Sequence, residues 1–473
     1  MIKDVGEFRK EAHKMVDRLA DYYENVESYP VKSQINPGDV SRMIPHNPPQ
    51  EAEGIDAIMS DFDKYIMPGL VHWQHPAFFA YFPANSSYSS VLAEMLTATI
   101  AQQGMVWETS PAAAELEEKM MEWLKDICGL PVQFTGVIQD TASASTLTAL
   151  LTARERSTQF TVNHVGFNAA PKLRIYCTSE THSSIEKAAR IAGFGSSNLV
   201  KIPVDDQFAM IPEKLEEAIL KDTKNGFEPC CIIGTIGTTS CTAVDPIEAI
   251  GTISKKFNIW FHVDGAYAGT AMVLSEMHHY AKGLEFADSY VFNPHKWMFT
   301  NFDCSAYFVK DKESLIKTFE ILPEYLKTGS RGKVNDYRDW GVALGRRFRA
   351  LKLWFVIRNF GIKGIQEKVR LHLDLAQWLT NQIKDNSDFE LLTETRFSLV
   401  CFRYKPKGIN DENQLNEMNK ALEAKLNSSG KLYISHTILK GKYTLRLVIA
   451  QTYVEPKHVF EAWDFIKESA SKQ

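Results

Sequence analysis

Hydrophobic positions recur at helical spacing in the first part of the chain. Residues 5–26 place apolar side chains at helical intervals with charges between them, and residues 55–66 repeat that pattern after a proline-rich stretch at 30–49. These segments have no evident core of their own. We therefore expect an N-terminal helical arm over residues 1–84, whose apolar stripes cover another surface of the protein or a second subunit.

From about residue 85 to residue 360, short apolar runs alternate with helical stretches. The predicted strands cover residues 136–139, 173–177, 199–202, 230–234, 259–263, 289–292 and 306–309. Helical patterns at 145–156 and 183–192 lie between some of them. Strands that alternate with helices predict an α/β domain with a doubly wound, mainly parallel sheet.

The C-terminal part of the chain follows another pattern. A helical run over 346–360 ends at Gly361, and a strand over 398–404, a helix over 412–425 and a strand over 444–450 come after it. We expect a smaller α+β domain over residues 361–473, joined to the large domain, residues 85–360, by the helical run.

Composition narrows the class of protein. The 473 residues are 44% hydrophobic and 23% charged, with a net charge of −5, as in soluble globular proteins. This charge offers no general attraction to nucleic acid or to an anionic membrane, and no stretch approaches the roughly 18 apolar residues of a membrane span. The seven cysteines include no C-x-x-C pair, so we expect neither a disulfide framework nor a metal site. A cytoplasmic protein is expected.

Side chains that can carry chemistry follow five of the predicted strands. They are hydroxyl residues from Thr141 onward after 136–139, His182 after 173–177, Thr238 and Thr239 after 230–234, Asp264 after 259–263, and His295 with Lys296 after 289–292. The carboxyl ends of parallel strands meet at one edge of a sheet, where ligands bind. We therefore expect these side chains to lie close together.

Each of these residues alone also has a structural explanation. Lys296 can be a solvated charge, Asp264 a helix cap, His182 a capping or core histidine, and Thr141, Ser143 and Ser145 caps of an ordinary helix. Together they match one requirement. Pyridoxal phosphate needs a lysine for its aldehyde, an acid for its ring nitrogen, a flat group over its ring and donors for its phosphate.

The sequence resembles the pyridoxal-phosphate-dependent group II decarboxylases, and within them the aromatic-L-amino-acid decarboxylases, over nearly the whole chain. The matching segments are EFRKEAHKMVD near the start, HWQHPAFFAYFPA at 72–84, SPAAAELEEKMMEWL at 110–124, HVDGAYAG at 262–269, EFADSYVFNPHKW at 285–297, NFDCSA at 301–306, DYRDW at 336–340 and LGRRFRALKLWFVIR at 344–358. NPHKW with an upstream HVDxAYAG is highly specific. The resemblance implies a fold-type I pyridoxal-phosphate enzyme, a lyase, that forms a homodimer with shared active sites.

The same resemblance implies a role for individual residues. Lys296 is expected to bond covalently to the cofactor's aldehyde, Asp264 to pair with the pyridine nitrogen, and Ala266 and His182 to cover the two faces of the ring. Ala142, Ser143, Thr239, Asn293 and His295 are expected around the phosphate and the neighbouring cofactor atoms. Asp140 and Ala144 differ from the Gly and Glu that relatives usually carry in this turn.

The segment 324–341 is polar and contains Gly329 and Gly332, which is typical of a surface loop or a functional lid. In the resembling family this segment closes over the site and presents a tyrosine, here Tyr337, to the reacting carbon. Relatives that make aldehydes carry phenylalanine at this position. The alternative role of Tyr337 is structural, as a ring that anchors the loop.

Aromatic residues suggest the substrate class. Trp73, Tyr81, Phe82 and Pro83 are expected to line a pocket for an aromatic side chain, although some rings of this segment, such as Phe78, fit an ordinary core. Gly345, where similar histidine decarboxylases and plant tyrosine-type enzymes tend to carry Ser, leaves room for indole or catechol. By family analogy, Met105 and Gln103 reach the neighbouring subunit's pocket.

The leading hypothesis is pyridoxal-phosphate-dependent decarboxylation of tryptophan, 5-hydroxytryptophan, DOPA, tyrosine or phenylalanine to the amine and CO2. An aromatic aldehyde synthase and a histidine decarboxylase of the same family are the alternative enzymes. A cofactor-free scaffold is disfavoured by the intact set of Lys296, Asp264 and His182. A nucleotide site is disfavoured too, because GFGSSN at 193–198 lacks the third glycine of a dinucleotide-binding motif.

Overall fold

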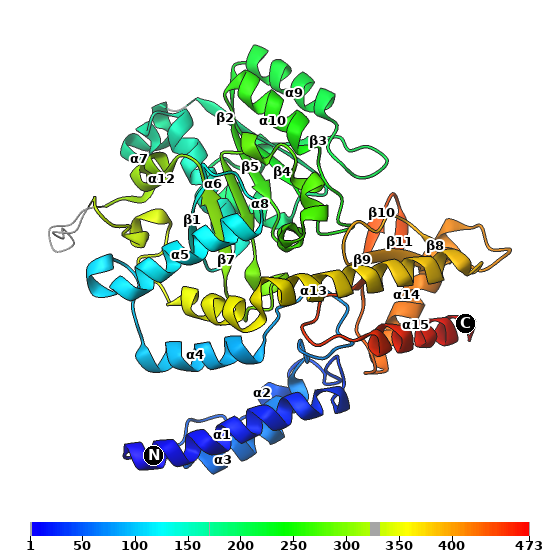
Figure 1. Cartoon of the computed structure of the whole chain (residues 1–473). Coiled ribbons are helices and arrows are strands. Elements are labelled where there is room, and N and C mark those ends of the chain that lie inside the picture. Colours follow the sequence, from blue (N-terminus) through cyan, green and yellow to red (C-terminus); the bar gives the residue numbers. More distant parts are fainter. Residues whose placement is uncertain (1, 170, 322–331, 473) are drawn as a thin grey trace. The chain divides into compact units, whose positions relative to one another are not determined.

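The computed structural model of the chain describes residues 2–169, 171–321 and 332–472, which form two compact units (Figure 1). The first unit comprises residues 1–81, 377–392 and 400–473, and the second comprises residues 82–376 and 393–399. The N-terminal residues thus group with the C-terminal ones instead of forming a unit of their own. The backbone shows why, because Phe79 donates to the carbonyl of Tyr433 at 2.8 Å and accepts from the amide of Val448 at 2.9 Å.

The second unit contains a seven-stranded sheet whose strands lie where the sequence predicts them. In order across the sheet these are β1 (Thr135–Gln139), β7 (Ser305–Val309), β6 (Ser289–Phe292), β5 (Trp260–Asp264), β4 (Phe227–Thr235), β2 (Lys172–Thr178) and β3 (Leu199–Ile202). β7 is antiparallel to both of its neighbours, and the other strands all run in one direction. The mainly parallel, doubly wound α/β fold is confirmed.

Helices cover both faces of this sheet. The helices of the unit are α4 (Tyr88–Ile100), α5 (Pro111–Ile127), α6 (Ala142–Ser157), α7 (Thr161–Val165), α8 (Ser183–Ile191), α9 (Pro212–Lys224), α10 (Ile247–Phe257), α11 (Pro294–Trp297) and α12 (Lys312–Phe319). Apolar residues of α6 and α8 bury one face in a cluster with Cys231, Trp260 and Val291. α9 and α10 pack against β4, and Ile247 of α10 lies beside Gly234 on the opposite face. A parallel sheet covered in this way buries the core on both sides.

The first unit contains a four-stranded sheet and five helices of its own. Its strands lie in the order β10 (Ser435–Leu439), β11 (Lys442–Val448), β9 (Leu399–Tyr404) and β8 (Phe389–Leu391). Its helices are α1 (Val5–Asn25), α2 (Asp39–Met43), α3 (Ile55–Asp61), α14 (Glu412–Ser428) and α15 (Pro456–Ser471). The long run α13 (Arg349–Asp385) is shared by both units and is interrupted at Gly361, where φ is 67°.

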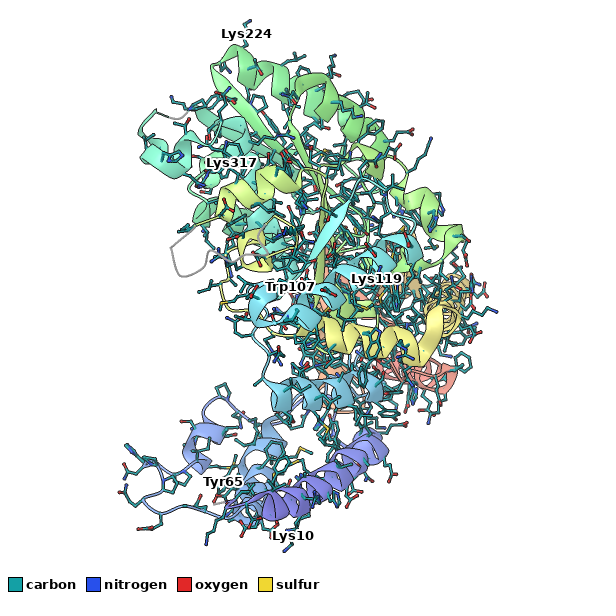
Figure 2. All side chains as sticks on the ribbon, turned by 60° about the vertical axis from the view of Figure 1, so that its left-hand side comes forward. Lys10, Tyr65, Trp107, Lys119, Lys224 and Lys317 are labelled. Atoms are coloured by element: carbon teal, nitrogen blue, oxygen red, sulfur yellow. The ribbon has the colours of Figure 1, made fainter. Side chains whose placement is uncertain are left out.

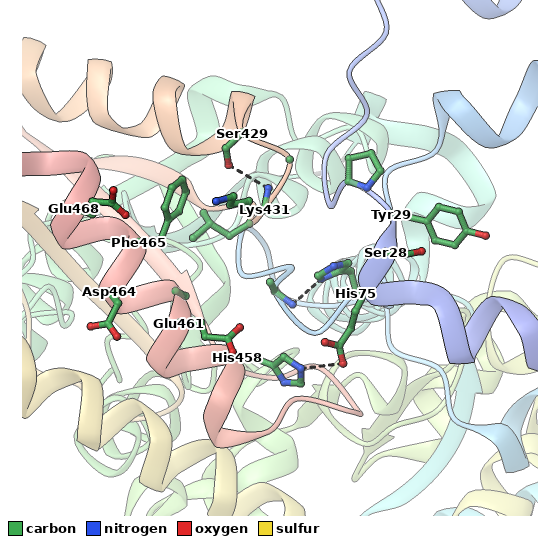
Figure 3. A pocket seen from close by; sticks show the side chains of 16 residues that line it. Ser28, Tyr29, His75, Ser429, Lys431, His458, Glu461, Asp464, Phe465 and Glu468 are labelled. Carbon is green, nitrogen blue, oxygen red and sulfur yellow. Dashed lines mark hydrogen bonds and ion pairs between the residues drawn. The ribbon is translucent and has the colours of Figure 1, made fainter. Parts of the chain in front are cut away.

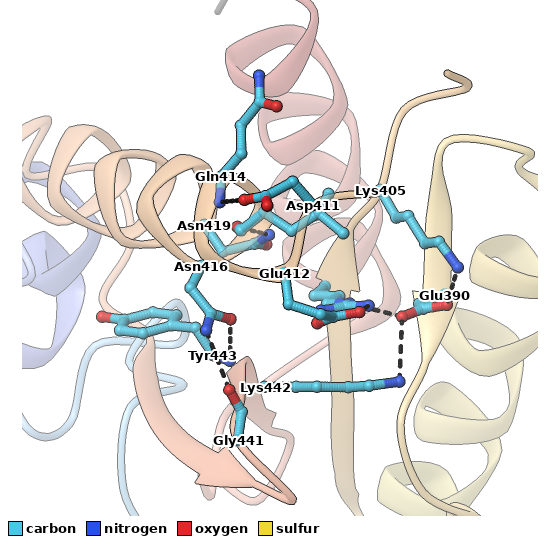
Figure 4. A network of polar contacts seen from close by, with 12 residues as sticks. Glu390, Lys405, Asp411, Glu412, Gln414, Asn416, Asn419, Gly441, Lys442 and Tyr443 are labelled. Atoms are coloured by element: carbon cyan, nitrogen blue, oxygen red, sulfur yellow. Dashed lines mark hydrogen bonds and ion pairs between the residues drawn. The ribbon is translucent and has the colours of Figure 1, made fainter. Parts of the chain in front are cut away.

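A buried arginine connects strand β9 of the small sheet to β8 and to the start of α14. Arg403 on β9 is fully buried, and its guanidinium donates to Glu390 at 2.5 Å and to both oxygens of Glu412 at 2.6 and 3.1 Å. Lys405 adds a contact of 3.0 Å to Glu390 (Figure 4). Two carboxylates thus compensate the buried charge, as a buried guanidinium requires.

Charged side chains cover the helices of both units. Lys10 on α1 and Lys224 on α9 are exposed and point outward from their helices (Figure 2). None of the helices in the described part of the chain has the length and apolar character that a membrane crossing requires. All seven cysteines are buried free thiols, so none forms a disulfide.

Candidate active site

Five parallel strands of the large sheet end at one edge, and a predicted site residue follows each of them. β1 leads into the start of α6, β2 into His182, β4 into Thr238 and Thr239, β5 ends on Asp264, and β6 leads into Lys296. β1 and β6 run in the same direction because both are antiparallel to β7. The chain therefore gathers these residues by sheet topology, as the alternation of strands and helices predicts.

Lys296 lies in the short helix α11, which starts directly after β6. The side-chain amide of Asn85 donates to the carbonyl of Lys296 at 2.6 Å. The backbone amide of Asn85 donates to the carbonyl of His295 at 3.1 Å. The Lys296 ammonium lies 5.5 Å from the centre of the Phe82 ring. Asn85 was not predicted, because nothing in its local sequence marks it as a support for Lys296.

A column of aromatic rings supports the lysine helix. Phe82 stacks on Tyr267 with ring centres 3.8 Å apart, and Tyr267 stacks on Trp297 at 4.8 Å. Trp297 then donates its indole N–H to Nδ1 of His372 at 2.9 Å. Such a column excludes water from one side of Lys296 and fixes the backbone that carries it.

Asp264 is the last residue of β5 and is only 5% exposed. Its Oδ1 accepts from the amide of Ala266 at 2.9 Å. The carboxylate is thus fixed by the turn that follows it, and Ala266 is held beside it. A buried and oriented carboxylate of this kind is suited to a cationic N–H partner.

His182 is the residue before α8 and caps this helix. Its Nδ1 lies 2.8 Å from the Ser184 hydroxyl and accepts from the Ser184 amide at 3.2 Å. The residue is exposed. Partial desolvation of the ring lowers the pKa of His182, the Asp264 carboxylate opposes that shift, and the Lys296 ammonium adds to it. The ring is therefore neutral at neutral pH and its orientation is set by the helix start.

Burial and neighbouring charges act on the three central groups in different directions. Burial lowers the pKa of the Lys296 ammonium, and the Asp264 carboxylate opposes that shift. Both groups also act on the pKa of His182. A desolvated lysine with a lowered pKa has more of the neutral amine that attacks an aldehyde.

The residues after β6 are held by a second set of hydrogen bonds. The side-chain oxygen of Asn293 accepts from the Ser305 hydroxyl at 2.7 Å. The backbone amide of Asn293 donates to the carbonyl of Ala266 at 2.9 Å. Nδ1 of His295 accepts from the amide of Cys304 at 2.8 Å. Burial lowers the pKa of His295 to about 3, with the Lys296 charge as a further cause, so this ring is neutral.

The turn between β1 and α6 exposes hydroxyl groups at a helix N-terminus. Thr141 caps α6 by accepting from the amide of Ala144 at 3.4 Å, and Ser143 is exposed at the first turn. Asp140 accepts from the amide of Thr141 at 2.6 Å, so the residue that departs from the family pattern is used within the turn. Thr239, after β4, is also exposed at this edge.

The predicted substrate residues fall into separate groups. Trp73 and Tyr81 belong to the first unit, where their rings lie 6.1 Å apart, and Pro83 is buried in the second unit. The segment with Gln103 and Met105 runs beside Gly345, because Gly104 donates to the carbonyl of Arg346 at 2.8 Å. Gly345 is exposed there.

Tyr337, the residue predicted to reach the reacting carbon, is buried in the described structure. It lies in the turn 337–340, is 2% exposed, and belongs to the apolar cluster under the sheet. Its ring packs 5.2 Å from Trp340, and the Arg346 guanidinium lies 4.9 Å from the ring centre. In this arrangement the ring anchors the segment, and its role at the reacting carbon stays a prediction. Residues 324–331 of the predicted lid lie outside the described residues.

A family model for the pyridoxal-dependent decarboxylase conserved domain matches residues 37–405, which include every strand of the large sheet and the whole edge described above. The chain belongs to the pyridoxal-dependent decarboxylases. Its relatives place it among the members that act on aromatic amino acids.

Two curated relatives and one solved structure illustrate the likeness. Tyrosine decarboxylase 3 of Petroselinum crispum is 41% identical, over 98% of this chain and 92% of that protein. Phenylacetaldehyde synthase of Arabidopsis thaliana is 43% identical, over 99% and 96%. The structure of Oryza sativa TDC with PLP and tryptamine superposes with a TM-score of 0.97 at 34% identity, covering 100% of this chain and 99% of that one.

The residues at the sheet edge fit the cofactor of this family, pyridoxal phosphate. The desolvated amine of Lys296 suits an aldehyde, and the buried Asp264 carboxylate suits a protonated ring nitrogen. The hydroxyls at the start of α6 suit a phosphate, because a helix N-terminus attracts anions. The likeness to the solved structure confirms the fold-type I assignment.

A separate cavity lies within the first unit. It has a volume of about 740 Å³ and is lined by residues that include Glu27, Tyr29, His75, Lys431 and His458 (Figure 3). His458 lies 3.2 Å from the Glu27 carboxylate. None of the predicted site residues lines this cavity.

Proposed function

We propose that this chain is a homodimeric decarboxylase that converts aromatic L-amino acids into the corresponding amines and CO2. The observation that carries the proposal is the placement of Lys296, Asp264 and His182 at the carboxyl ends of β6, β5 and β2, at one edge of the sheet. Each of the three is positioned by a strand end or a helix start.

We assign Lys296 as the residue that holds the cofactor's aldehyde carbon. When bound, pyridoxal phosphate supplies an electron-withdrawing ring that stabilises negative charge at the carbon that loses CO2. Asp264 holds a proton at the ring nitrogen, and Ala266 and His182 cover the two ring faces. Ala142, Ser143, Thr239, Asn293 and His295 surround the phosphate and the neighbouring atoms. The neutral state of His295 leaves it able to donate one hydrogen bond and accept another.

Proton delivery to the former α-carbon requires an acid that reaches the site. We propose that Tyr337, in the segment 324–341, supplies this proton. This step separates the amine-forming decarboxylase from an aldehyde synthase, the second candidate, which relatives named phenylacetaldehyde synthase keep open.

The substrate is proposed to be an aromatic amino acid with a large ring. Phe82 lies beside the Lys296 amine, and Gly345 has open space, since an added Cβ would meet only Gln103, at 3.9 Å. Trp73, Tyr81, Pro83 and Met105 complete the proposed substrate set. Relatives of this chain are named tyrosine decarboxylase and tryptophan decarboxylase, which agrees with a pocket for an aromatic ring.

The homodimer is proposed because α1 buries none of its residues in the described structure. Val5, Phe8 and Val16 on this helix are exposed by 70%, 54% and 43%. An apolar stripe of this kind is suited to a second copy of the chain. Sedimentation of the purified protein as a monomer at assay concentration would contradict this part of the proposal.

The experiment that tests the substrate class is a panel of amino acids with detection of the amine. Tryptophan, 5-hydroxytryptophan, DOPA, tyrosine and phenylalanine are compared with histidine and glutamate under the same conditions. We expect amine from at least one of the first five and none from glutamate. Activity confined to histidine would replace the proposal with the histidine decarboxylase alternative.

A further inference from the structure

Two buried polar atoms beside Asp264 have no hydrogen-bond partner among the described residues. They are the hydroxyl of Thr235 on β4 and Nε2 of His262 on β5. Thr235 is 4% exposed and His262 is fully buried. Because buried polar groups in native proteins are almost always paired, an orphan at the edge of an active site indicates a partner that arrives with the ligand or moves on binding.

The register of the sheet places both atoms next to Asp264. Thr235 and Asp264 are paired across β4 and β5. Paired residues of neighbouring strands are about 4.8 Å apart and present their side chains on the same face. His262 lies two residues before Asp264 on β5 and shares that face. Trp260 and Val291 of the same face belong to the apolar cluster below.

The backbone of Thr235 is fixed while its hydroxyl is not. Its amide donates to Oδ2 of Asp245 at 2.8 Å, and its carbonyl accepts from the amide of Asp245 at 2.9 Å. Rotation about χ1 is therefore the remaining freedom of this side chain. That rotation sweeps the hydroxyl over the face that Thr235 shares with Asp264.

A hydrogen-bond chain reaches Nδ1 of His262. The indole of Trp260 donates to the Ser289 hydroxyl at 3.0 Å, and that hydroxyl lies 2.9 Å from Nδ1 of His262. Burial lowers the pKa of His262 to about 4, so the ring is neutral and carries one proton. In the tautomer whose Nδ1 accepts from the Ser289 hydroxyl, that proton lies on Nε2.

We propose that Thr235 is a positioning residue for the cofactor, whose hydroxyl donates to the Asp264 carboxylate when that carboxylate engages the ring nitrogen. The second donor to the Asp264 carboxylate is Nε2–H of His262. With the Ala266 amide already on Oδ1, these donors stabilise the ionised carboxylate and fix its direction. The inference rests on the proposed role of Asp264.

The test compares three threonine variants by their affinity for pyridoxal phosphate. Thr235→Val removes the hydroxyl at nearly constant volume, and Thr235→Ser retains it. Thr148→Val is the matched control, because the Thr148 hydroxyl on α6 is also buried and without a partner among the described residues. The readouts are the dissociation constant from absorption titration of apo-protein and the melting temperature of the apo-protein.

We expect Thr235→Val to bind pyridoxal phosphate about tenfold more weakly, the effect of losing one charge-assisted hydrogen bond. Thr235→Ser and Thr148→Val should bind as the unchanged protein does. The apo-protein of Thr235→Val should melt at the same or a higher temperature, since an unpaired buried hydroxyl has been removed. A structural role would instead lower that temperature.

Two results would overturn the inference. One is unchanged affinity of Thr235→Val, and the other is an equal loss in Thr235→Val and Thr148→Val, which would indicate a general effect of core substitution. Asp264→Asn separates this failure from that of the proposed function. If Asp264→Asn binds pyridoxal phosphate weakly while Thr235→Val does not, only the inference fails. If Asp264→Asn binds normally, the assignment of Asp264 fails as well.

Discussion

The reactivity of Lys296 depends on its surroundings. Burial lowers the pKa of its ammonium, the Phe82 ring lies 5.5 Å away, and Asn85 holds the backbone carbonyl. A lysine on the surface has none of these features and remains protonated. The chemistry of this residue is therefore a property of the edge of the sheet at which it lies.

Lys296→Ala should abolish both the visible absorption of bound pyridoxal phosphate and the decarboxylase activity. The reason is that Lys296 is the one residue to which we assign the bond with the cofactor's aldehyde. The absorption spectrum and the amine yield are measured on the same preparation. Lys310 follows β7 directly and is partly buried, so Lys310→Ala is the control for the loss of a partly buried lysine. A retained visible band in Lys296→Ala would show that another lysine holds the cofactor.

Gly345→Ser should reduce activity toward tryptophan more than toward tyrosine, because the added hydroxymethyl group overlaps a bicyclic ring, at a cost of about 1–3 kcal/mol. An added Cβ meets only Gln103, at 3.9 Å, so the melting temperature should not change. The ratio of kcat/KM values for the two substrates is the measurement. Equal losses for both would show that Gly345 does not line the ring pocket.

Most site residues could be predicted because strand ends determine their positions. β4 and β6 contain continuous apolar runs, and β2 and β5 are mostly apolar, which is the pattern of strands covered on both faces. Asp264, His182 and Lys296 could therefore be assigned to one edge. β8 and β10 were not predicted. β8 has three residues, and β10 alternates exposed and buried positions over a polar sequence, so neither gives a strong signal.

Tyr337 shows what the local sequence does not contain. It lies in a segment of polar and charged residues, where a ring is expected to be mobile or exposed. Its burial depends on Trp340, Arg346 and the cluster under the sheet, which come together only in the folded chain. The position of the Thr235 hydroxyl beside Asp264 could not be predicted either. It depends on the register between β4 and β5, which the sequence of one strand does not determine.

Tyr337→Phe should shift the product from amine toward aldehyde, ammonia and hydrogen peroxide, since it removes the proposed proton donor. Amine and peroxide are measured together in air for the unchanged enzyme and the variant. Weaker activity with amine still as the product would instead show that Tyr337 acts only as an anchoring ring.

At the scale of the whole molecule, buried histidines make folding sensitive to acid. Burial lowers the pKa of His75 in the first unit to about 4, against about 6.5 in an unfolded chain. Between these values the unfolded chain binds a proton that the folded chain does not. The free energy of unfolding therefore decreases as the pH falls from about 6.5 to about 4, by up to about 1.4 kcal/mol per pH unit for this residue.

His75→Gln should make that decrease less steep. Urea unfolding at several pH values between 6.5 and 4 gives the slope for the unchanged chain and for the variant. Asp245, whose pKa burial raises to about 7, acts in the opposite direction but is present in both proteins, so the difference isolates His75. Identical slopes would show that His75 is accessible to protons in the folded chain.

The most direct test of the account is the product formed by the unchanged enzyme in air. With pyridoxal phosphate and an accepted aromatic amino acid, CO2, amine and hydrogen peroxide are quantified in one reaction. The account predicts one amine for each CO2 and little peroxide. Aldehyde and peroxide as the main products would contradict it and would identify an aldehyde synthase built on the same fold and cofactor.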